Sequence, residues 1–213
     1  MIFLDSAHPS DARTAYQTQL VSGITTNPAL LSQAGDDDAS IISKLCDAST
    51  GWVFYQLDGP TPESRAATAR SIQALRPGRV GLKIPCTREN LTLAAELIQE
   101  GATVGITAIF SAAQALLAAE IGAHYILPYV NRSTRLLGDG PGLVRQMRGI
   151  IDQSDAPTQI IAASIKSPEE AAETVLAGAH HLTLPLPVIE AMATHELSEQ
   201  AIAEFLEARG RAR

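Results

Sequence analysis

The chain has few lysines and few cysteines, and it lacks both long apolar runs and an excess of positive charge. Its 213 residues carry 23 acidic side chains against 16 lysines and arginines, which gives a net charge of -7. With no basic stripe, this balance argues against a protein that binds nucleic acid or an anionic membrane. No apolar run approaches the ~20 residues that span a bilayer, so we expect no membrane partner.

Several site types also lack their sequence signatures. The two cysteines, Cys46 and Cys86, are far apart and form no CxxC pair, which favours a reduced, cytoplasmic protein without a signal peptide. The histidines show no H-E-x-x-H spacing, so we expect no metal. No G-x-G-x-x-G opens a helix after the first apolar run, so a dinucleotide site has no support and we expect no cofactor.

Lysine is scarce but stands in an unusual place. Three lysines occur against thirteen arginines, and one of them, Lys83, lies inside the apolar run Val80-Gly81-Leu82-Lys83-Ile84-Pro85. Burial disfavours the ammonium form and lowers the pKa of a lysine, which leaves a neutral amine that attacks carbonyl groups to form Schiff bases. The structural alternatives are a lysine that snorkels from a strand end and a buried ion pair.

Short runs rich in β-branched residues alternate with longer stretches rich in Ala, Leu, Glu and Gln, with a period of roughly 25 residues. The short runs predict strands at 2–5, 23–26, 52–57, 80–84, 103–107, 124–128, 159–162 and 181–184. The longer stretches predict helices near 9–20, 39–48, 61–76, 88–100, 111–121, 140–153, 168–177 and 187–194.

Eight strand–helix units in a chain of this length predict one α/β domain over residues 1–213. We expect a parallel (β/α)8 TIM barrel over about residues 1–195, with a doubly wound open sheet as the main competitor. An additional amphipathic C-terminal helix is predicted at about 197–209, where it would pack on a neighbouring subunit. The basic tail, 209–213, is expected to fray.

In such a barrel, alternate strand residues face the lumen and chemistry gathers at the carboxyl ends of the strands. Alternation within 80–84 points Lys83 into the lumen, while Leu82 and Ile84 face the helices. Other polar side chains stand at or just beyond predicted strand ends: Asp5, Thr26, Asn27, Gln56, Thr107, Tyr129, Arg132, Ser164 and Lys166. These residues are therefore the candidates for a shared site.

Five stretches carry a resemblance to a known family. They are Gly23-Ile24-Thr25-Thr26-Asn27-Pro28, Leu82-Lys83-Ile84-Pro85, Ala112-Ala113-Gln114-Ala115-Leu116-Leu117, Pro128-Tyr129-Val130-Asn131-Arg132 and Ala162-Ala163-Ser164-Ile165-Lys166. Together they resemble the small-subunit transaldolase family, and most closely its fructose-6-phosphate aldolase branch. The resemblance covers almost the whole chain. It implies a TIM barrel, a metal-free class I (Schiff-base) mechanism, a sugar-phosphate substrate and a homo-oligomer, either a decamer or a pentamer.

The resemblance also implies roles for the residues of the chemistry. Lys83 would form the Schiff base, and Asp5 would handle the C4 hydroxyl proton unless it only caps the first helix. Gln56, Thr107 and Tyr129 would hold the water that relays protons. The alternative for Gln56 and Tyr129 is that they are hydrogen-bonded core residues.

Further roles concern the substrate. Arg132, Ser164 and Lys166 would hold its phosphate, although Arg132 is also suited to a surface ion pair and Lys166 is a competing amine. Asn27 and Thr26 would contact the donor, although an Asn before proline is also a routine turn residue.

Four positions distinguish the aldolase branch from the transaldolases of this family. Transaldolases typically carry Glu and Phe where Gln56 and Tyr129 stand, so both residues favour an aldolase. Gly105 and Leu127 replace an Asn and a Ser that bind the donor in transaldolases, and Leu127 is expected to narrow the donor pocket.

The resemblance thus favours a class I aldolase that cleaves fructose 6-phosphate, or a close analogue, to dihydroxyacetone and glyceraldehyde 3-phosphate. The first alternative is a transaldolase that transfers the dihydroxyacetone unit between sugar phosphates. The second is a non-catalytic sugar-phosphate-binding barrel.

Overall fold

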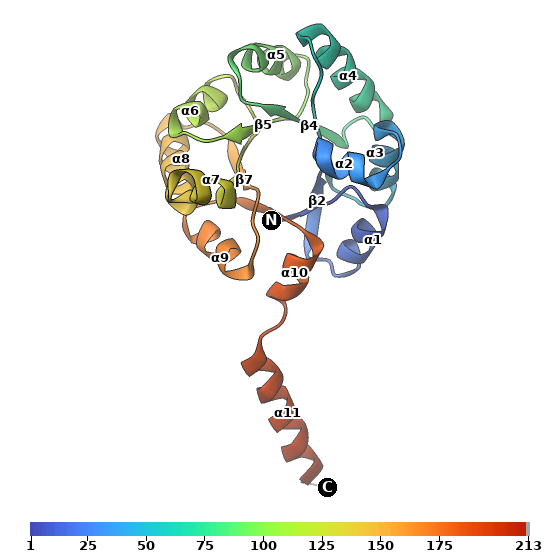
Figure 1. The fold of residues 1–213 in the computed structure, drawn as a ribbon, viewed down its shortest axis with the longest axis vertical. Helices are drawn as coiled ribbons and strands as arrows, with labels where there is room; N and C mark the ends of the chain where they lie inside the picture. Colours follow the sequence, from blue (N-terminus) through green and yellow to red (C-terminus); the bar gives the residue numbers. More distant parts are fainter. Residues whose placement is uncertain (212–213) are drawn as a thin grey trace.

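The computed structural model describes residues 1–211, in which eight parallel strands close into a barrel surrounded by helices (Figure 1). The strands are β1 (Ile2–Asp5), β2 (Val21–Thr25), β3 (Trp52–Gln56), β4 (Val80–Pro85), β5 (Val104–Ile109), β6 (Tyr125–Pro128), β7 (Gln159–Ala162) and β8 (His181–Leu184). Each strand pairs with its neighbours in chain order, and β1 closes the barrel on β8. The predicted TIM barrel is confirmed, and the doubly wound open sheet is wrong.

Helices follow the strands on the outside of the barrel. They are α1 (Pro9–Gln17), α2 (Pro28–Ala34), α3 (Asp38–Asp47), α4 (Pro62–Leu75), α5 (Arg88–Gln99), α6 (Ala112–Glu120), α7 (Val130–Leu137), α8 (Gly140–Ser154), α9 (Pro168–Leu176), α10 (Leu186–Met192) and α11 (Glu196–Arg211). The predicted C-terminal helix is therefore present and includes the first part of the basic tail, where we expected fraying. Residues 212 and 213 lie outside the described residues.

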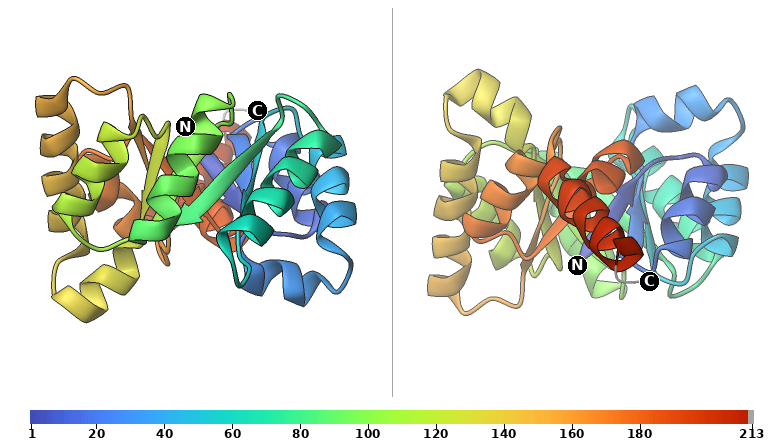
Figure 2. Two further views of the ribbon diagram at one scale, coloured as in Figure 1. Left: turned by 90° about the horizontal axis from the view of Figure 1, so that it is seen from above. Right: turned by 90° about the horizontal axis from the view of Figure 1, so that it is seen from below.

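The short helices α2 and α7 are absent from the sequence-based prediction. Each is inserted between a strand end and the longer helix that covers the barrel wall, in places where the sequence suggested only loops. Figure 2 shows α2 in blue and α7 in yellow projecting together beyond one end of the barrel. Both follow strand carboxyl ends directly, so this is the end at which a TIM barrel carries its site.

Hydrophobic side chains fill the barrel on both sides of its wall. Between strands and helices lie fully buried residues such as Leu82 and Ile84. The lumen is filled by a separate cluster, Phe3, Phe54, Leu127 and Ile161, which we call the lumen floor. Successive residues of β4 thus face opposite sides, as the alternation of the strand predicts.

Three glycines make room for the lumen floor. A Cβ atom at Gly23 would lie 2.5 Å from the ring of Phe3. A Cβ atom at Gly81 would lie 2.5 Å from the ring of Phe54, and one at Gly105 would lie 2.6 Å from Leu127 Cδ1. Real Cβ atoms do not approach other atoms so closely, because close-packed interiors leave no spare volume. The large residue of each pair therefore occupies the space that a side chain on the neighbouring strand would need.

Helix α11 leads away from the barrel (Figure 1). Large apolar side chains on it are open to solvent, among them Leu197, Ile202, Phe205 and Leu206, and Phe205 is 72% exposed. Within residues 1–211, no helix is both long and apolar enough to cross a membrane.

Candidate active site

A pocket of about 300 Å³ opens at the carboxyl ends of the strands. It is lined by Asp5, Asn27, Pro28, Ala29, Gln56, Lys83, Tyr129, Arg132, Ala163, Ser164 and Lys166. The structure thus brings eight of the ten predicted site residues into one pocket, and it places Thr26 and Thr107 behind the lining. A larger hollow of about 860 Å³ lies between α1 and α3, on the outer helices and away from the strand ends.

Lys83 lies at the inner end of this pocket. It is 2% exposed, and its Nζ donates a hydrogen bond to the carbonyl oxygen of Thr26 at 2.8 Å. Burial lowers the pKa of Lys83, and the negative charge of Asp5 opposes that effect only in part. Because the amine is deeply buried and bonded to a carbonyl, the geometry matches neither a snorkelling lysine nor a close ion pair.

Asp5 ends β1 and is half-buried in the pocket wall. Its Oδ1 accepts a hydrogen bond from Thr25 Oγ1 at 2.9 Å. The first helix has His8 at its N-cap, with no side-chain cap, so the alternative in which Asp5 caps that helix is wrong. The carboxylate is therefore available to a molecule in the pocket.

Two members of the predicted trio, Gln56 and Tyr129, line the same pocket as Lys83, and the third, Thr107, lies behind Tyr129. Gln56 pairs in register with Lys83 on the adjacent strand, and its buried Oε1 has no hydrogen-bond partner within residues 1–211. Thr107 is fully buried and donates from Oγ1 to the phenol oxygen of Tyr129 at 3.2 Å. An amide oxygen and a phenol thus offer hydrogen bonds to a small polar molecule beside the amine.

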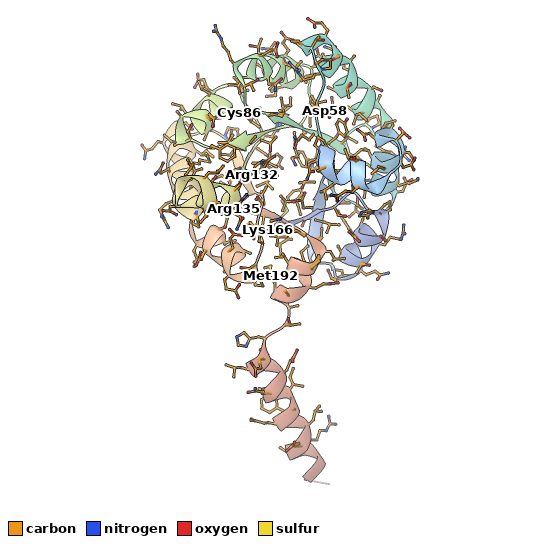
Figure 3. All side chains as sticks on the ribbon, in the orientation of Figure 1. Asp58, Cys86, Arg132, Arg135, Lys166 and Met192 are labelled. Carbon is orange, nitrogen blue, oxygen red and sulfur yellow. The ribbon has the colours of Figure 1, made fainter. Side chains whose placement is uncertain are left out.

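One wall of the pocket is basic. Arg132 near the start of α7 and Lys166 in the loop after β7 are exposed at the barrel opening, where Figure 3 shows them along one side. The guanidinium carbon of Arg132 lies 4.9 Å from the centroid of the Tyr129 ring, a cation–π arrangement that aims the side chain toward the pocket. Arg132 therefore has an aromatic neighbour in the pocket, whereas the alternative for it was a surface ion pair.

Ser164 belongs to the same wall and has a strained backbone. Its φ of 61° lies in the left-handed region, which is uncommon for a serine, and its carbonyl accepts from Asn131 N–H at 3.1 Å. Such conformations concentrate at functional sites because the surrounding structure must hold them in place.

Of the two residues after β2, Asn27 lines the pocket and Thr26 does not. Asn27 Oδ1 accepts from Leu30 N–H at 3.1 Å as the N-cap of α2, which leaves the amide nitrogen to donate to a ligand. Thr26 is fully buried, and its hydroxyl donates to the carbonyl of Phe54. The side chain of Thr26 therefore does not reach the pocket, and its carbonyl holds Lys83.

One polar residue near the site was missed by the sequence analysis. Thr183 lies on β8, is 1% exposed, and contacts Thr25 through their hydroxyl oxygens at 2.6 Å. The available signal was a single hydroxyl between Leu182 and Leu184 in a buried strand. Among residues 1–211, no group of three or more His, Cys, Asp or Glu is placed to hold a metal ion.

The fold and the pocket are those of a TIM barrel that carries a buried lysine amine in a candidate site at the carboxyl ends of its strands. A family model described as "Transaldolase/Fructose-6-phosphate aldolase" matches residues 2–212. The chain belongs to this family, and it is an enzyme of the transaldolase/aldolase type.

Curated relatives agree over nearly the full length. A "Probable transaldolase" of Phenylobacterium zucineum (strain HLK1) is 36% identical over 205 residues, covering 96% of this chain and 94% of the relative. A "Probable transaldolase" of Maridesulfovibrio salexigens is 36% identical over 203 residues, covering 95% and 94%.

Solved structures of low sequence identity resemble this chain in fold only. A flavocytochrome b2 variant with sulfite bound gives a TM-score of 0.62 at 12% identity and covers 87% of this chain, which spans 57% of that structure. A mandelate oxidase variant gives a TM-score of 0.62 at 14% identity, covering 87% of this chain and 64% of that structure.

Proposed function

We propose that this enzyme is a class I aldolase that reversibly cleaves fructose 6-phosphate, or a close analogue, to dihydroxyacetone and glyceraldehyde 3-phosphate. The observation that carries the proposal is the buried amine of Lys83, whose pKa is lowered by burial, at the inner end of a pocket with a carboxylate and a basic wall. A neutral amine in such a place is a nucleophile for ketones.

The proposed reaction begins when the Lys83 amine adds to the ketone carbon of the sugar. Loss of one water molecule gives an iminium ion. Asp5 then accepts the proton of the C4 hydroxyl, the C3–C4 bond breaks, and its electron pair moves into the iminium to form an enamine while the aldehyde leaves. Protonation at C3 and addition of water release dihydroxyacetone and restore the amine.

Gln56, Thr107 and Tyr129 are proposed to hold the water used in these steps. The unpartnered Oε1 of Gln56 would accept a hydrogen bond from that water, and the Tyr129 phenol, which accepts from Thr107, would donate one. This order leaves each hydrogen-bonding group satisfied during hydrolysis of the imine.

Arg132, Ser164 and Lys166 are proposed to bind the phosphate. Arginine offers a planar fork and lysine a point charge, and both side chains are open to solvent at the mouth of the pocket. The phosphate end of the sugar would therefore lie outward and the ketone end inward. Asn27 would contribute its amide nitrogen to a donor hydroxyl.

Transfer of the three-carbon unit between sugar phosphates is the second candidate function. It is favoured by the name "Probable transaldolase" that the full-length relatives carry. Gln56 and Tyr129 favour the aldolase, since the resemblance places Glu and Phe at these positions in transaldolases. Free dihydroxyacetone formed without an acceptor aldehyde supports the aldolase, and product that appears only with acceptor supports the transaldolase.

Trapping of the Schiff base tests the chemistry common to both candidates. Borohydride reduction in the presence of fructose 6-phosphate is expected to attach the sugar fragment to Lys83, as located by peptide mass mapping. Lys83→Met should abolish both adduct and activity, whereas Lys166→Met should keep the adduct on Lys83. A wild-type protein without adduct would instead be a non-catalytic sugar-phosphate-binding barrel.

We also propose that residues 1–213 form one domain that assembles into a homo-oligomer, a decamer or pentamer as the resemblance implies. The exposed apolar side chains of α11 support this, because apolar surface that leads away from a barrel is suited to a neighbouring subunit. A cytoplasmic location is proposed from the free cysteines Cys46 and Cys86.

A further inference from the structure

A pair of buried hydroxyl groups lies behind Asp5, on the side away from the pocket. Thr25 on β2 is fully buried, and Thr183 on β8 is 1% exposed. Thr25 Oγ1 is 2.9 Å from Asp5 Oδ1 and 2.6 Å from Thr183 Oγ1. Three adjacent strands, β8, β1 and β2, thus place three polar groups in one hydrogen-bonded chain.

The direction of this chain follows from the number of protons available. An ionised carboxylate only accepts hydrogen bonds, so Thr25 donates its single hydroxyl proton to Asp5. The proton in the contact between the two threonines must then come from Thr183. The chain therefore runs from Thr183 to Thr25 to Asp5.

The hydroxyls have no packing reason to be there. Valine has the shape of threonine, and the rest of the lumen beside them is filled by apolar groups such as Phe3 and Ile161. Burying a hydroxyl costs free energy unless the hydrogen bonds it makes compensate for the loss of water. Two buried hydroxyls that end on one carboxylate oxygen indicate that the carboxylate is what they act on.

We propose that Thr183 is a positioning residue for Asp5 that acts through Thr25. Hydrogen bonds in series polarise one another, and bonds to an ionised group are stronger than neutral ones. The hydrogen-bonded series of Thr183, Thr25 and Asp5 holds Oδ1 of Asp5 against the barrel wall. It leaves Oδ2 of Asp5 to accept the hydroxyl proton of the substrate. This inference rests on the proposed function, which gives Asp5 a proton to accept.

Thr183→Val tests the inference, because it keeps the shape and removes the hydroxyl. We expect kcat for carbon–carbon cleavage to fall about tenfold, while borohydride trapping on Lys83 stays as in the wild type. Thr183→Ser should restore most of kcat. Thr158→Val is the matched control: Thr158 is 1% exposed and donates to the Ala123 carbonyl, so this variant loses a buried hydrogen bond but should keep kcat.

A double-mutant cycle with Asp5→Asn makes the test specific. In that background Thr183→Val should cause no further loss of kcat, because the group it positions is gone. An unchanged kcat in the single variant, or a second tenfold loss in the Asp5→Asn background, would overturn the inference. A wild-type enzyme that forms no adduct would instead overturn the proposed function. If Thr183→Val does not fold, Thr183→Ala should show the same split between kcat and trapping.

Discussion

At the scale of single residues, the pocket is governed by what surrounds one amine. Lys83 is buried above an apolar floor, and this burial lowers its pKa and favours the neutral amine even though the charge of Asp5 acts in the opposite direction. The same burial destabilises the folded protein whenever the lysine is charged. Function and stability therefore oppose each other at this position, as they do at many active sites.

Because a buried charged lysine destabilises the fold, we predict that Lys83→Met increases stability in a pH-dependent way. The unfolded lysine has the ordinary pKa of 10.5 and the folded one a lower pKa, so between the two values the unfolded chain binds more protons and wild-type stability rises with pH. Methionine removes this dependence. The variant should be more stable at pH 7 by on the order of 1 kcal/mol, and the gain should shrink as the pH approaches 10.5.

Urea denaturation at pH 7 and pH 10 measures the effect. The control is Lys44→Met, which removes an exposed lysine that pairs with Asp36 and should leave stability nearly unchanged at both pH values, because exposed ion pairs contribute little. A gain for Lys83→Met that is equal at both pH values would contradict the explanation by burial of the charge.

At the scale of elements, neighbouring strands share the volume of the lumen. Leu127 on β6 is fully buried, packs in the lumen floor and fills the space beside Gly105 on β5. From the sequence we expected Leu127 to narrow the donor pocket, but Leu127 is not among the residues that line the pocket and lies in the lumen floor against Gly105 instead. The two positions form a unit in which one side chain is large and the other is absent.

This unit predicts coupled effects on stability. Gly105→Ala should destabilise the protein by about 1 to 3 kcal/mol because its Cβ would meet Leu127. Leu127→Ala should cost about 2 to 5 kcal/mol through the cavity it leaves. The double variant should cost less than the sum, because the new methyl group enters the new cavity.

Denaturant unfolding of all four proteins measures the coupling. Gly149→Ala on α8 is the control, since a Cβ there has open space and should stabilise the helix by roughly 0.5 to 1 kcal/mol. Additive costs for Gly105→Ala and Leu127→Ala would show that the two side chains do not compete for the same space.

The elements also show which parts of the structure could be predicted from the sequence. The period of strand and helix predicted the barrel, because each strand buries both faces and each helix one. Helices α2 and α7 were missed, since seven and eight residues after a strand end give too little periodicity. Thr183 was missed because its partner Thr25 is 158 residues away in the chain and meets it only after the barrel closes.

At the scale of the whole molecule, α11 stands apart from the barrel and carries several exposed apolar side chains. Phe205 and Leu206 are 72% and 64% exposed, and Leu197 and Ile202 on the same helix are exposed as well. Some apolar side chains of the barrel helices, such as Leu137 and Leu176, are also open to solvent. An apolar face without a partner in its own chain lowers its free energy by packing on another copy.

Substitution of that face should therefore lower the mass of the assembly. We expect the Phe205→Ser, Leu206→Ser double variant to form smaller particles than the wild type in size-exclusion chromatography with light scattering. Gln200→Ala, on the opposite side of the same helix, is the control and should leave the mass unchanged. Equal masses for all three proteins would remove α11 from the interface.

The filled lumen floor has a consequence for the order of events. Phe3, Phe54, Leu127 and Ile161 close the barrel beneath Lys83, so the pocket opens to solvent past the basic wall of Arg132 and Lys166. In the proposed reaction the fragment with the phosphate stands between the opening and the fragment attached to Lys83. The aldehyde must then depart before the ketone. Product inhibition should show this ordered release. Dihydroxyacetone should bind the empty enzyme, and glyceraldehyde 3-phosphate should bind the enzyme that still carries the three-carbon unit.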